Sequence, residues 1–545
     1  MSLVAPLISW IRPVLPIPSA VASVGMLSVV FSGAWAGTIR AASGDPVVDV
    51  TGGSIRGRAL PDGGAVFKGI PFARPPVGEL RWREPQAVAP WTGVRDAAPS
   101  GPPCAQVALG WNDATAAAGR EDCLYLDVWA PPAEAGRRHA VMVWIHGGAN
   151  LAGSGGADPL YDGRAFVRRG VMLVVIQYRV GILGFFAHPG LTRESPHHAS
   201  GNYGILDQIA ALHWVRDNSA TFGGEPENVT VFGQSAGAFD LLTLMTSPLA
   251  RGLFHRAIAE SAAPLPTPDV FPSLAQAEQA GARLAAGLGV PADDALRRLR
   301  ALPVDELLGA QREAGWNFGP INADGWVFPA APAGVFAAGR AAPVPLLIGS
   351  NAIEFPADPS PAKLRQAIGA TFRDRAPRAL ALYGLAGEGT PAPADPVYGD
   401  RAEQVGSDPL RCAAVVEGEW HGRAGNPVWE YQFDRAIPPR PVTGHSSELP
   451  YVFGNLYAGG SQGGAFAEAD RRLSATIQGY WTNFAKTGDP NGPGLPDWPR
   501  YDADARRYLE FTPAAGVAAS QNQRGPVCDL FRELLNAATG ARSER

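Results

Sequence analysis

The sequence predicts an α/β protein whose core is a mostly parallel, doubly wound sheet. Residues 171–180 (V-M-L-V-V-I-Q-Y-R-V) form a continuous apolar run, which is typical of a strand buried on both faces. Apolar residues recur at helical spacing in 205–218, and another apolar strand follows at 229–232. This second strand leads into a glycine-rich turn and a helix at 236–245. Strands that alternate with helices in this way indicate βαβ units and a parallel sheet.

The other expected elements extend the same pattern. The segment 47–72 alternates apolar residues with glycine turns and predicts an antiparallel meander. Further β-rich runs are expected to form strands at 124–129, 140–145, 255–259, 344–348 and 428–433. Helical segments at 275–302 and 361–382 are expected to pack above the carboxyl edge of the sheet, where active sites of such sheets lie.

Length and composition limit the possible classes of protein. The 545 residues are 46% hydrophobic and 18% charged, and the formal net charge is -5. This mild acidic balance gives no reason to expect a nucleic-acid or anionic-membrane partner. The 65 glycines and 51 prolines are spread along the chain, which predicts many ordered loops. Because the chain has no internal repeat and no convincing linker, residues 37–545 are expected to form one domain with insertions.

The N-terminal segment has the features of a secretory signal. Residues 20–31 are apolar and uncharged, Arg12 precedes them, and Gly33-Ala34-Trp35-Ala36 follows. These small residues predict cleavage after Ala36, and the apolar run is too short to span a bilayer. Residues 1–36 are therefore expected to be removed and the mature protein to be secreted or periplasmic. A start at Met26, a misannotated start upstream and an ordinary core helix are the alternatives.

Four cysteines in a chain that is expected to be exported predict two disulfides. Three pairings are possible. Cys104 with Cys123 would close a local loop, and Cys412 with Cys528 would tie the last helix to the body of the protein. Four buried thiols are the alternative.

Residues 228–237 (N-V-T-V-F-G-Q-S-A-G) place a short strand directly before Gly-x-Ser-x-Gly. This context indicates a nucleophile elbow, a tight strand-to-helix turn that lifts the serine hydroxyl clear of the backbone. Gly233 and Gly237 leave room where side chains would collide, so Ser235 is the candidate nucleophile. A second match centred on Ser461 lies in a Gly/Ser/Gln-rich stretch with no strand before it, which is typical of a loop.

A serine hydroxyl needs a base, and that base needs an orienting carboxylate. His445 follows the strand expected at 428–433 and lies in a polar loop, whereas His421 lies in a helical stretch and is expected at the surface. Glu354 follows the strand expected at 344–348, and Asp358 is its nearby rival. Loop placement favours His445 as the base and Glu354 as the acid.

Acyl transfer also needs hydrogen-bond donors for the developing oxyanion. After the strand expected at 140–145, the sequence His146-Gly147-Gly148-Ala149 is typical of a turn that exposes backbone N–H groups. Gly148 and Ala149, with Ala236 after the nucleophile, are the expected donors. A purely structural glycine turn is the alternative.

Several longer segments resemble those of type-B carboxylesterases, the family of cholinesterases and bacterial para-nitrobenzyl esterases. The resemblance extends from about residue 47 to residue 535. It rests on F-K-G-I-P-F-A-R-P-P-V-G-E-L-R-W (67–82), E-D-C-L-Y-L-D-V-W (121–129), Y-R-V-G-I-L-G-F (178–185), G-N-Y-G-I-L-D-Q (201–208) and Y-W-T-N-F-A-K-T-G-D-P-N (480–491). Coincidence does not explain so many matching segments.

This resemblance implies an α/β-hydrolase fold with helical insertions above the carboxyl edge of the sheet. It implies that Ser235, Glu354 and His445 form a triad, with Gly148, Ala149 and Ala236 as oxyanion donors. It supports the pairings Cys104–Cys123 and Cys412–Cys528. Ser261 and Glu448 match positions of a buried polar network that supports the base in relatives. No metal ion and no organic cofactor are implied.

Two residues depart from the usual pattern of the resembled family. Relatives usually have Glu before the nucleophile, where this chain has Gln234. They usually have an aromatic residue after the oxyanion glycines, where Asn150 is expected to present a polar group toward the substrate. Because of this polar group, cholinesterase selectivity is not carried over. Trp111 lies near the position of a choline-binding tryptophan in cholinesterases, but the loop lengths differ.

The sequence therefore predicts a serine hydrolase that cleaves small carboxylic esters through an acyl-enzyme. The alternative is a catalytically silent relative that acts as a binding or adhesion module. Such relatives lose triad residues, whereas Ser235, Glu354 and His445 are all present here. Neither the natural ester nor the oligomeric state follows from the sequence.

Overall fold

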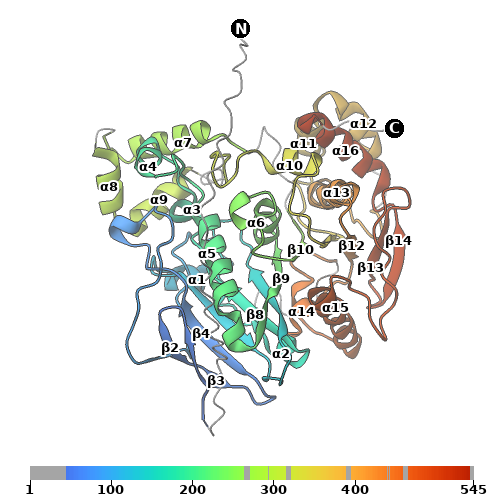
Figure 1. Ribbon diagram of the computed structural model, residues 1–545. Helices are drawn as coiled ribbons and strands as arrows, with labels where there is room; N and C mark the ends of the chain where they lie inside the picture. The colour runs from blue at the N-terminus through green and yellow to red at the C-terminus, as the bar shows by residue number, and fades with distance from the viewer. Residues whose placement is uncertain are drawn as a thin grey trace, which may run out of the picture. The chain divides into compact units, whose positions relative to one another are not determined.

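The computed structural model describes residues 44–262, 271–291, 294–314, 321–387, 394–437, 440, 442–457 and 464–540 (Figure 1). The expected signal segment, residues 1–36, lies outside the described residues, and so does Ser461.

An 11-stranded mixed sheet forms the core of the described part, in the order β14-β13-β12-β11-β10-β9-β7-β8-β6-β4-β3. Its strands in chain order are β3 (Arg58–Ala59), β4 (Ala65–Pro71), β6 (Tyr125–Ala130), β7 (His139–Ile145), β8 (Val171–Ile176), β9 (Gly224–Gln234), β10 (Arg256–Glu260), β11 (Leu346–Asn351), β12 (Val428–Phe433), β13 (Arg507–Phe511) and β14 (Val517–Gln521). Within this sheet order, every neighbouring pair from β13 to β8 is parallel. On one side β14 pairs antiparallel with β13, and on the other β6 pairs antiparallel with β8 and with β4. The mostly parallel sheet expected from the sequence is therefore confirmed.

A separate three-stranded sheet contains β1 (Val47–Val50), β2 (Gly53–Arg56) and β5 (Val94–Asp96). Strands β1 and β2 pair antiparallel, and β2 pairs parallel with β5. The meander expected at 47–72 is thus divided between two sheets, because β3 and β4 join the large sheet instead.

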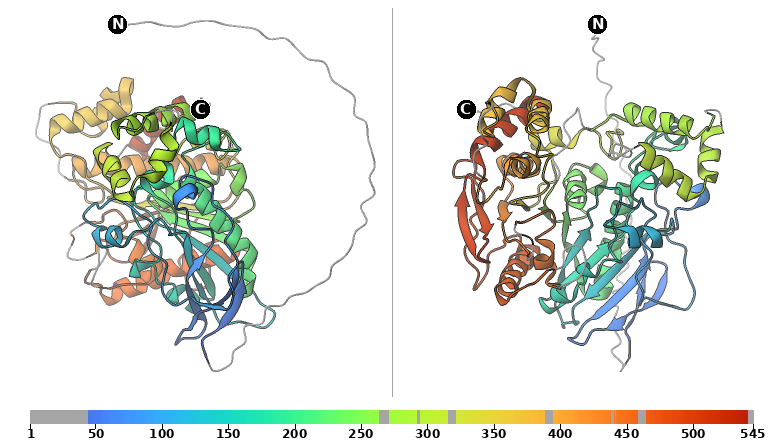
Figure 2. Two further views of the ribbon diagram at one scale, coloured as in Figure 1. Left: turned by 90° about the vertical axis from the view of Figure 1, so that its left-hand side faces the viewer. Right: turned by 180° about the vertical axis from the view of Figure 1, so that it is seen from behind.

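Helices connect and cover the strands, as Figures 1 and 2 show. They are α1 (Asp113–Ala118), α2 (Arg164–Arg168), α3 (Gly181–Phe185), α4 (Pro189–Glu194), α5 (Tyr203–Asn218), α6 (Ala236–Leu244), α7 (Leu274–Gly287), α8 (Ala295–Ala301), α9 (Val304–Ala314), α10 (Pro332–Ala337), α11 (Pro361–Phe372), α12 (Ala376–Leu382), α13 (Arg401–Arg423), α14 (Leu449–Phe453), α15 (Glu468–Thr487) and α16 (Gly525–Thr539). Helices α7, α8 and α11 lie on the side where β9 passes into α6, which is the carboxyl edge of the sheet.

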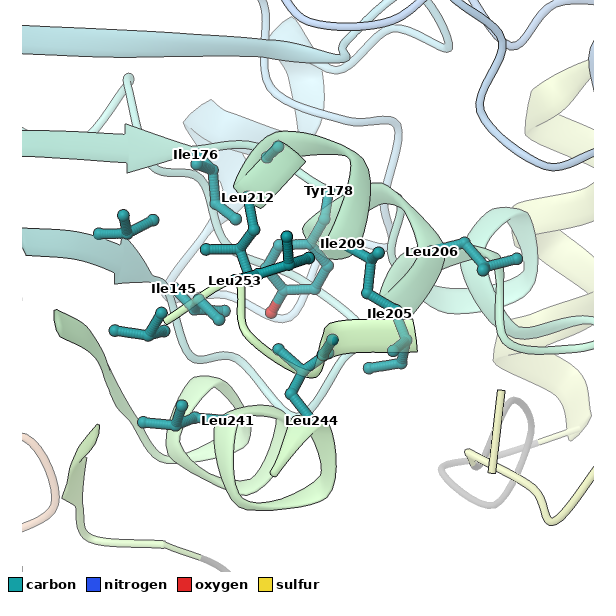
Figure 3. Packing of buried hydrophobic residues seen from close by; sticks show 14 of the residues in the cluster. Ile145, Ile176, Tyr178, Ile205, Leu206, Ile209, Leu212, Leu241, Leu244 and Leu253 are labelled. Atoms are coloured by element: carbon teal, nitrogen blue, oxygen red, sulfur yellow. The ribbon is translucent and has the colours of Figure 1, made fainter. Parts of the chain in front are cut away.

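Both faces of the central strands are packed, which explains their continuous apolar sequence. Every residue of β7 is buried, and successive side chains point to opposite faces. Val143 and Ile145 belong to the cluster that contains α5 and α6 side chains, which Figure 3 shows at close range. Trp144 belongs to the opposite cluster, together with Trp481 of α15. Each such buried side chain contributes about 1.5–3 kcal/mol to the driving force for folding.

The two long helical segments expected from the sequence are interrupted. Gly289 has a left-handed backbone (φ 69°) and breaks the segment expected at 275–302 into α7 and α8. Arg373, with φ 51°, separates α11 from α12 in the segment expected at 361–382. Apolar periodicity predicted the helices but not these breaks.

Two disulfides fasten loops and helices at the periphery of the sheet. Cys104 is bonded to Cys123, with Cα atoms 4.9 Å apart, and Cys412 of α13 is bonded to Cys528 of α16, with Cα atoms 4.8 Å apart. In the part of the chain that the structure describes, no helix has both the length and the apolar character that a membrane span requires.

Candidate active site

Ser235 lies at the turn between β9 and α6. Its backbone has φ 57° and ψ -124°, a sparsely populated conformation for a residue with a side chain. Such a conformation costs about 1–3 kcal/mol and persists only where the surroundings hold it. The Ser235 N–H donates to the Glu260 carbonyl at 2.9 Å, which fastens the turn to β10.

The two glycines of the motif are explained by close backbone contacts. A Cβ atom on Gly233 would lie 2.6 Å from the carbonyl carbon of Gly237. A Cβ on Gly237 would lie 2.1 Å from the carbonyl oxygen of Ile145, at the end of β7. Only glycine fits at either position, so the sharp turn depends on both.

His445 and Glu354 are 91 positions apart in the chain but form a direct hydrogen bond. The Nδ1 atom of His445 lies 2.7 Å from Oε2 of Glu354. Glu354 is 3% exposed, and its Oε1 accepts from the Asn351 N–H at 2.7 Å. The carboxylate therefore has a fixed orientation, and it favours the tautomer of His445 that carries its proton on Nδ1.

Adjacent strands supply the two loops that carry these residues. Glu354 follows β11 and His445 follows the neighbouring strand β12, and the His445 N–H donates to the Glu354 carbonyl at 3.1 Å. The Ile353 N–H donates to Thr443 Oγ1 at 3.0 Å, which joins the loops again. Ser407 of α13 accepts from the Glu354 N–H at 2.9 Å, so this helix also positions the acid.

The rival residues lie elsewhere. Asp358 is exposed, and its carboxylate accepts from the Ser360 N–H at 2.9 Å, just before α11. His421 is helical as expected but is not at the surface: it is buried in α13, and its Nε2 lies 2.7 Å from the Val344 carbonyl. Burial lowers the pKa of His421. The expectation of a surface position was wrong because the polar sequence around His421 gives no sign that α13 is packed on nearly every side.

Gln234 contacts the opposite nitrogen of the candidate base. Its amide Nε2 is 3.2 Å from His445 Nε2, and its side chain is buried. With the histidine proton on Nδ1, the Gln234 amide donates to Nε2, the atom that would receive the serine proton. Phe355 covers the same imidazole, with ring centroids 4.1 Å apart, although 47% of Phe355 is exposed. The histidine ring is thus held at both nitrogens and on one face.

A buried polar network lies behind Glu354. The Asn351 amide donates to Glu448 Oε2 at 2.7 Å and to Ser261 Oγ at 3.4 Å. Burial and the neighbouring Glu354 carboxylate raise the pKa of Glu448 to about 7. Burial and Glu448 raise the pKa of Glu260 well above its usual range, and Glu260 accepts from the Trp481 indole at 2.7 Å. Asn351 and Glu260 were not identified from the sequence, because their partners are far away in the chain.

The glycine turn after β7 packs directly on the nucleophile elbow. A Cβ on Gly147 would lie 2.7 Å from the Gln234 carbonyl oxygen and 3.0 Å from Ser235 Cβ. Gly148 has φ 115° and Ala149 has φ 58°, so the turn has left-handed backbone at both candidate donors. Ala236, the third candidate, is the first residue of α6, where backbone N–H groups have no partner within the helix.

The side chain of Asn150 is buried and that of Trp111 is exposed. Asn150 was expected to present a polar group to the substrate, but its side chain is buried and its Nδ2 donates to Asp240 of α6 at 2.7 Å. The backbone of Asn150 is left-handed, with φ 56°. Trp111 is 58% exposed, so it forms no enclosed aromatic wall.

A cavity of about 210 Å³, lined by Trp82, Tyr203 and other residues, includes none of the triad candidates.

Comparison with known proteins gives the same family throughout. A model described as "Carboxylesterase family" matches residues 44–366 and 404–530. The fumonisin B1 esterase of Sphingopyxis macrogoltabida is 38% identical over 461 residues, which cover 80% of this chain and 81% of that protein. The medium-chain fatty acyl-CoA hydrolase precursor of Anas platyrhynchos is 36% identical, with 88% and 91% covered. The liver carboxylesterase of Sus scrofa is 33% identical, with 94% and 96% covered.

The fold comparison agrees with the sequence comparison. A solved structure of a PNB esterase is 32% identical to this chain, with a TM-score of 0.76, and the match covers 89% of this chain and 99% of that one. The family match covers well over half of the chain, and the similarity extends over most of each relative. This chain therefore belongs to the carboxylesterase family of ester hydrolases and has the α/β-hydrolase fold.

Proposed function

We propose that this protein hydrolyses carboxylic esters through an acyl-enzyme formed on Ser235, with His445 as the base and Glu354 as the orienting acid. The observation that carries the proposal is the 2.7 Å hydrogen bond between His445 Nδ1 and Glu354 Oε2, on an imidazole whose Nε2 lies 3.2 Å from the amide of Gln234, the residue directly before Ser235. Membership of the carboxylesterase family supports the reaction class.

The proposed reaction has two halves. Ser235 Oγ attacks the ester carbonyl carbon while His445 Nε2 takes the hydroxyl proton, and His445 then gives that proton to the departing alcohol oxygen. In the second half a water molecule attacks the acyl-enzyme, His445 again moves the proton, and the carboxylic acid leaves. Glu354 keeps the imidazole in one tautomer and stabilises its protonated form.

The negative charge that develops on the carbonyl oxygen needs fixed donors. We assign these to the backbone N–H groups of Gly148, Ala149 and Ala236. The close packing of Gly147 on Ser235 supports this assignment, because it brings the glycine turn next to the nucleophile. Donors fixed before the reaction cost no reorganisation when the charge appears.

The substrate class follows in part from Gln234. A neutral amide next to His445 provides no negative charge that would repel a carboxylate near the scissile bond. We propose that the site accepts polar or anionic esters as well as neutral ones. Two relatives are named for different substrates, one as a fumonisin B1 esterase and the other as a fatty acyl-CoA hydrolase. Members of the family therefore differ in substrate.

Export is the proposed cellular context, with residues 1–36 as a cleaved signal and 37–545 as one mature domain. The two disulfides support it, because disulfides persist in oxidising compartments. A relative described as a precursor agrees with this context. N-terminal sequencing of the secreted protein tests it: a mature end at Gly37 is expected, and an intact Met1 would exclude cleavage.

The direct test is an ester assay on purified protein and on Ser235→Ala. The wild type should release carboxylate from simple esters, and the variant should lose on the order of 10⁶ in kcat while staying folded. An inactive but folded wild type would instead favour the catalytically silent binding module.

A further inference from the structure

Asn150 follows the proposed oxyanion donors directly, yet its side chain points into the protein. Its Nδ2 donates to Asp240 Oδ1 at 2.7 Å, and Gln208 of α5 donates its Nε2 to the other carboxylate oxygen, Oδ2, at 2.6 Å. Asp240 is completely buried and lies on α6, five positions after Ser235. One carboxylate therefore connects the oxyanion turn, the helix of the nucleophile and α5.

The turn that this carboxylate holds is strained. Ala149 and Asn150 are consecutive non-glycine residues with left-handed backbone, at φ 58° and φ 56°. Asparagine tolerates this conformation better than most residues, but two such residues in a row persist only where the surroundings hold them. The Gly181 N–H donates to the Asn150 carbonyl at 2.6 Å, and the Tyr178 hydroxyl lies 3.3 Å from Asn150 Oδ1. Asn150 is thus fastened at its backbone and at both ends of its amide.

The direction of the Ala149 N–H depends on this turn, and Ala236 lies on the same helix as Asp240. We propose that Asn150 and Asp240 are positioning residues that align the two parts of the oxyanion hole, the 148–149 turn and the start of α6. This inference rests on the proposed function, since it assigns a role to groups that act on that reaction. Neither residue touches the reacting atoms; both act through the backbone N–H groups.

A carboxylate suits this role because both of its oxygens accept. The two donors are amide NH2 groups from different elements, each directed at its own carboxylate oxygen, and an asparagine in the same place would direct an NH2 group at one of them. Burial raises the pKa of Asp240 to about 7, against the hydrogen bonds from Asn150 and Gln208 that favour the charged form. Burial of a carboxylate lowers the stability of the folded protein. The two amide donors, one to each oxygen, explain why position 240 nevertheless has a carboxylate.

The test compares Asp240→Asn with the wild type at pH 8.5, above the pKa of about 7 to which burial raises Asp240. With both partner amides in their present orientation, the new side chain keeps only one of the two contacts, because its NH2 group faces the NH2 group of Asn150 or of Gln208. We expect kcat to fall by about 10–100-fold with little change in KM, since a displaced oxyanion donor affects the transition state more than the bound substrate. Affinity for a trifluoromethyl ketone, which forms an oxyanion with Ser235, should fall by a similar factor.

A second variant separates positioning from simple destabilisation. In Asp240→Asn combined with Gln208→Glu, the new amide can accept from Asn150 while its NH2 donates to the carboxylate now at position 208. This exchange should recover at least tenfold in kcat. Thr243→Val is the matched control, because Thr243 is also buried on α6 but its hydroxyl donates to the Phe239 carbonyl and not to the oxyanion turn. Its kcat should stay near that of the wild type.

The outcomes distinguish this inference from the proposed function. If wild-type activity survives Ser235→Ala, the proposed function fails. If activity depends on Ser235 but folded Asp240→Asn keeps its kcat and its ketone affinity, the positioning role is wrong. If Asp240→Asn does not fold, Asn150→Gly serves in its place, because glycine accepts the left-handed backbone and loses only the side-chain contact. An unchanged kcat in that variant would equally overturn the inference.

Discussion

The imidazole of His445 is held by Glu354 at one nitrogen, by Gln234 at the other and by Phe355 on one face. Sequence position favoured His445 and Glu354, because each follows a strand at the carboxyl edge of the sheet. The contacts of Gln234 and Phe355 could not be read from the sequence, since they depend on side-chain directions in a loop. The same is true of the buried Asn150 side chain and its contact with Asp240.

The assignment of the acid and the base predicts a pair of contrasts. His445→Ala should lower kcat by on the order of 10⁶, and Glu354→Gln by about 10⁴, because each removes a member of a unit that acts together. Asp358→Asn should leave kcat nearly unchanged, since Asp358 is exposed and its carboxylate accepts a hydrogen bond from the Ser360 N–H. Steady-state kinetics on simple esters gives the comparison.

His421→Ala is the control for loss of a histidine. It should lower the melting temperature, because His421 is buried and bonded to Val344, without a comparable loss of kcat. A larger effect of Asp358→Asn than of Glu354→Gln would show that the acid is wrongly assigned.

Gln234 predicts the charge preference of the site. Gln234→Glu places a negative charge next to His445, and one charge a few ångströms away is worth about 1–4 kcal/mol before screening. The substitution should lower kcat/KM for a carboxylate-bearing ester and raise it for a quaternary-ammonium analogue, relative to a neutral ester. Gln521→Glu, which adds the same charge at an exposed strand end, should change none of these ratios. Equal ratios in wild type and Gln234→Glu would exclude charge tuning by this residue.

Glu448 predicts a pH dependence of stability. Because burial and Glu354 raise its pKa to about 7, Glu448 binds its proton more tightly in the folded chain than in the unfolded chain. Its contribution to the free energy of unfolding is therefore largest at acidic pH and declines as the pH rises from about 4 to about 7. Glu448→Gln has no proton to lose, so its stability relative to wild type should increase between pH 5 and pH 8, by at most about 3 kcal/mol.

Thermal unfolding of both proteins across that pH range measures the difference. Ser261→Ala removes a neighbouring polar group that does not ionise, so its difference from wild type should stay constant with pH. A Glu448→Gln difference that is equally constant would contradict the raised pKa.

At the scale of elements, the strands were the easiest part to predict. The fully buried β7 and β8 have apolar sequences because helices cover both faces of the sheet. Breaks in the helices were harder, since left-handed residues such as Gly289 and Arg373 interrupt an apolar pattern that itself continues. The role of α13 in holding Glu354 through Ser407 was not predictable, because that contact joins residues 53 positions apart.

The disulfides predict a graded loss of stability. Cys412–Cys528 closes 116 positions and joins α13 to α16, whereas Cys104–Cys123 closes only 19. The chain-entropy account gives upper values of about 5 and about 3 kcal/mol for the two bonds. Replacing Cys412 and Cys528 by alanine should therefore lower the denaturation midpoint more than replacing Cys104 and Cys123. A smaller effect at Cys412–Cys528 would show that strain or residual structure, not loop length, decides the outcome.

At the scale of the whole molecule, the parallel sheet explains why distant residues meet. Strands β9, β11 and β12 all end at the same edge of the sheet. The segments that follow these three strands therefore place Ser235, Glu354 and His445 at that edge. The order of these residues along the chain, with strand ends before each, made their position at this edge predictable without knowledge of the contacts. The contacts of Asp240 with Gln208 and of Asn351 with Glu448 were not predictable, since the partners in each pair come from different elements of the structure.

The central claim is that Ser235 is the residue acylated during ester cleavage, and covalent labelling tests it most directly. A fluorophosphonate probe should react with one serine per chain, abolish esterase activity in proportion to the label, and place its mass on the peptide that contains Ser235. Ser235→Ala should take up no label. A stoichiometric label on another serine such as Ser461, or full labelling of Ser235 with activity retained, would contradict the account.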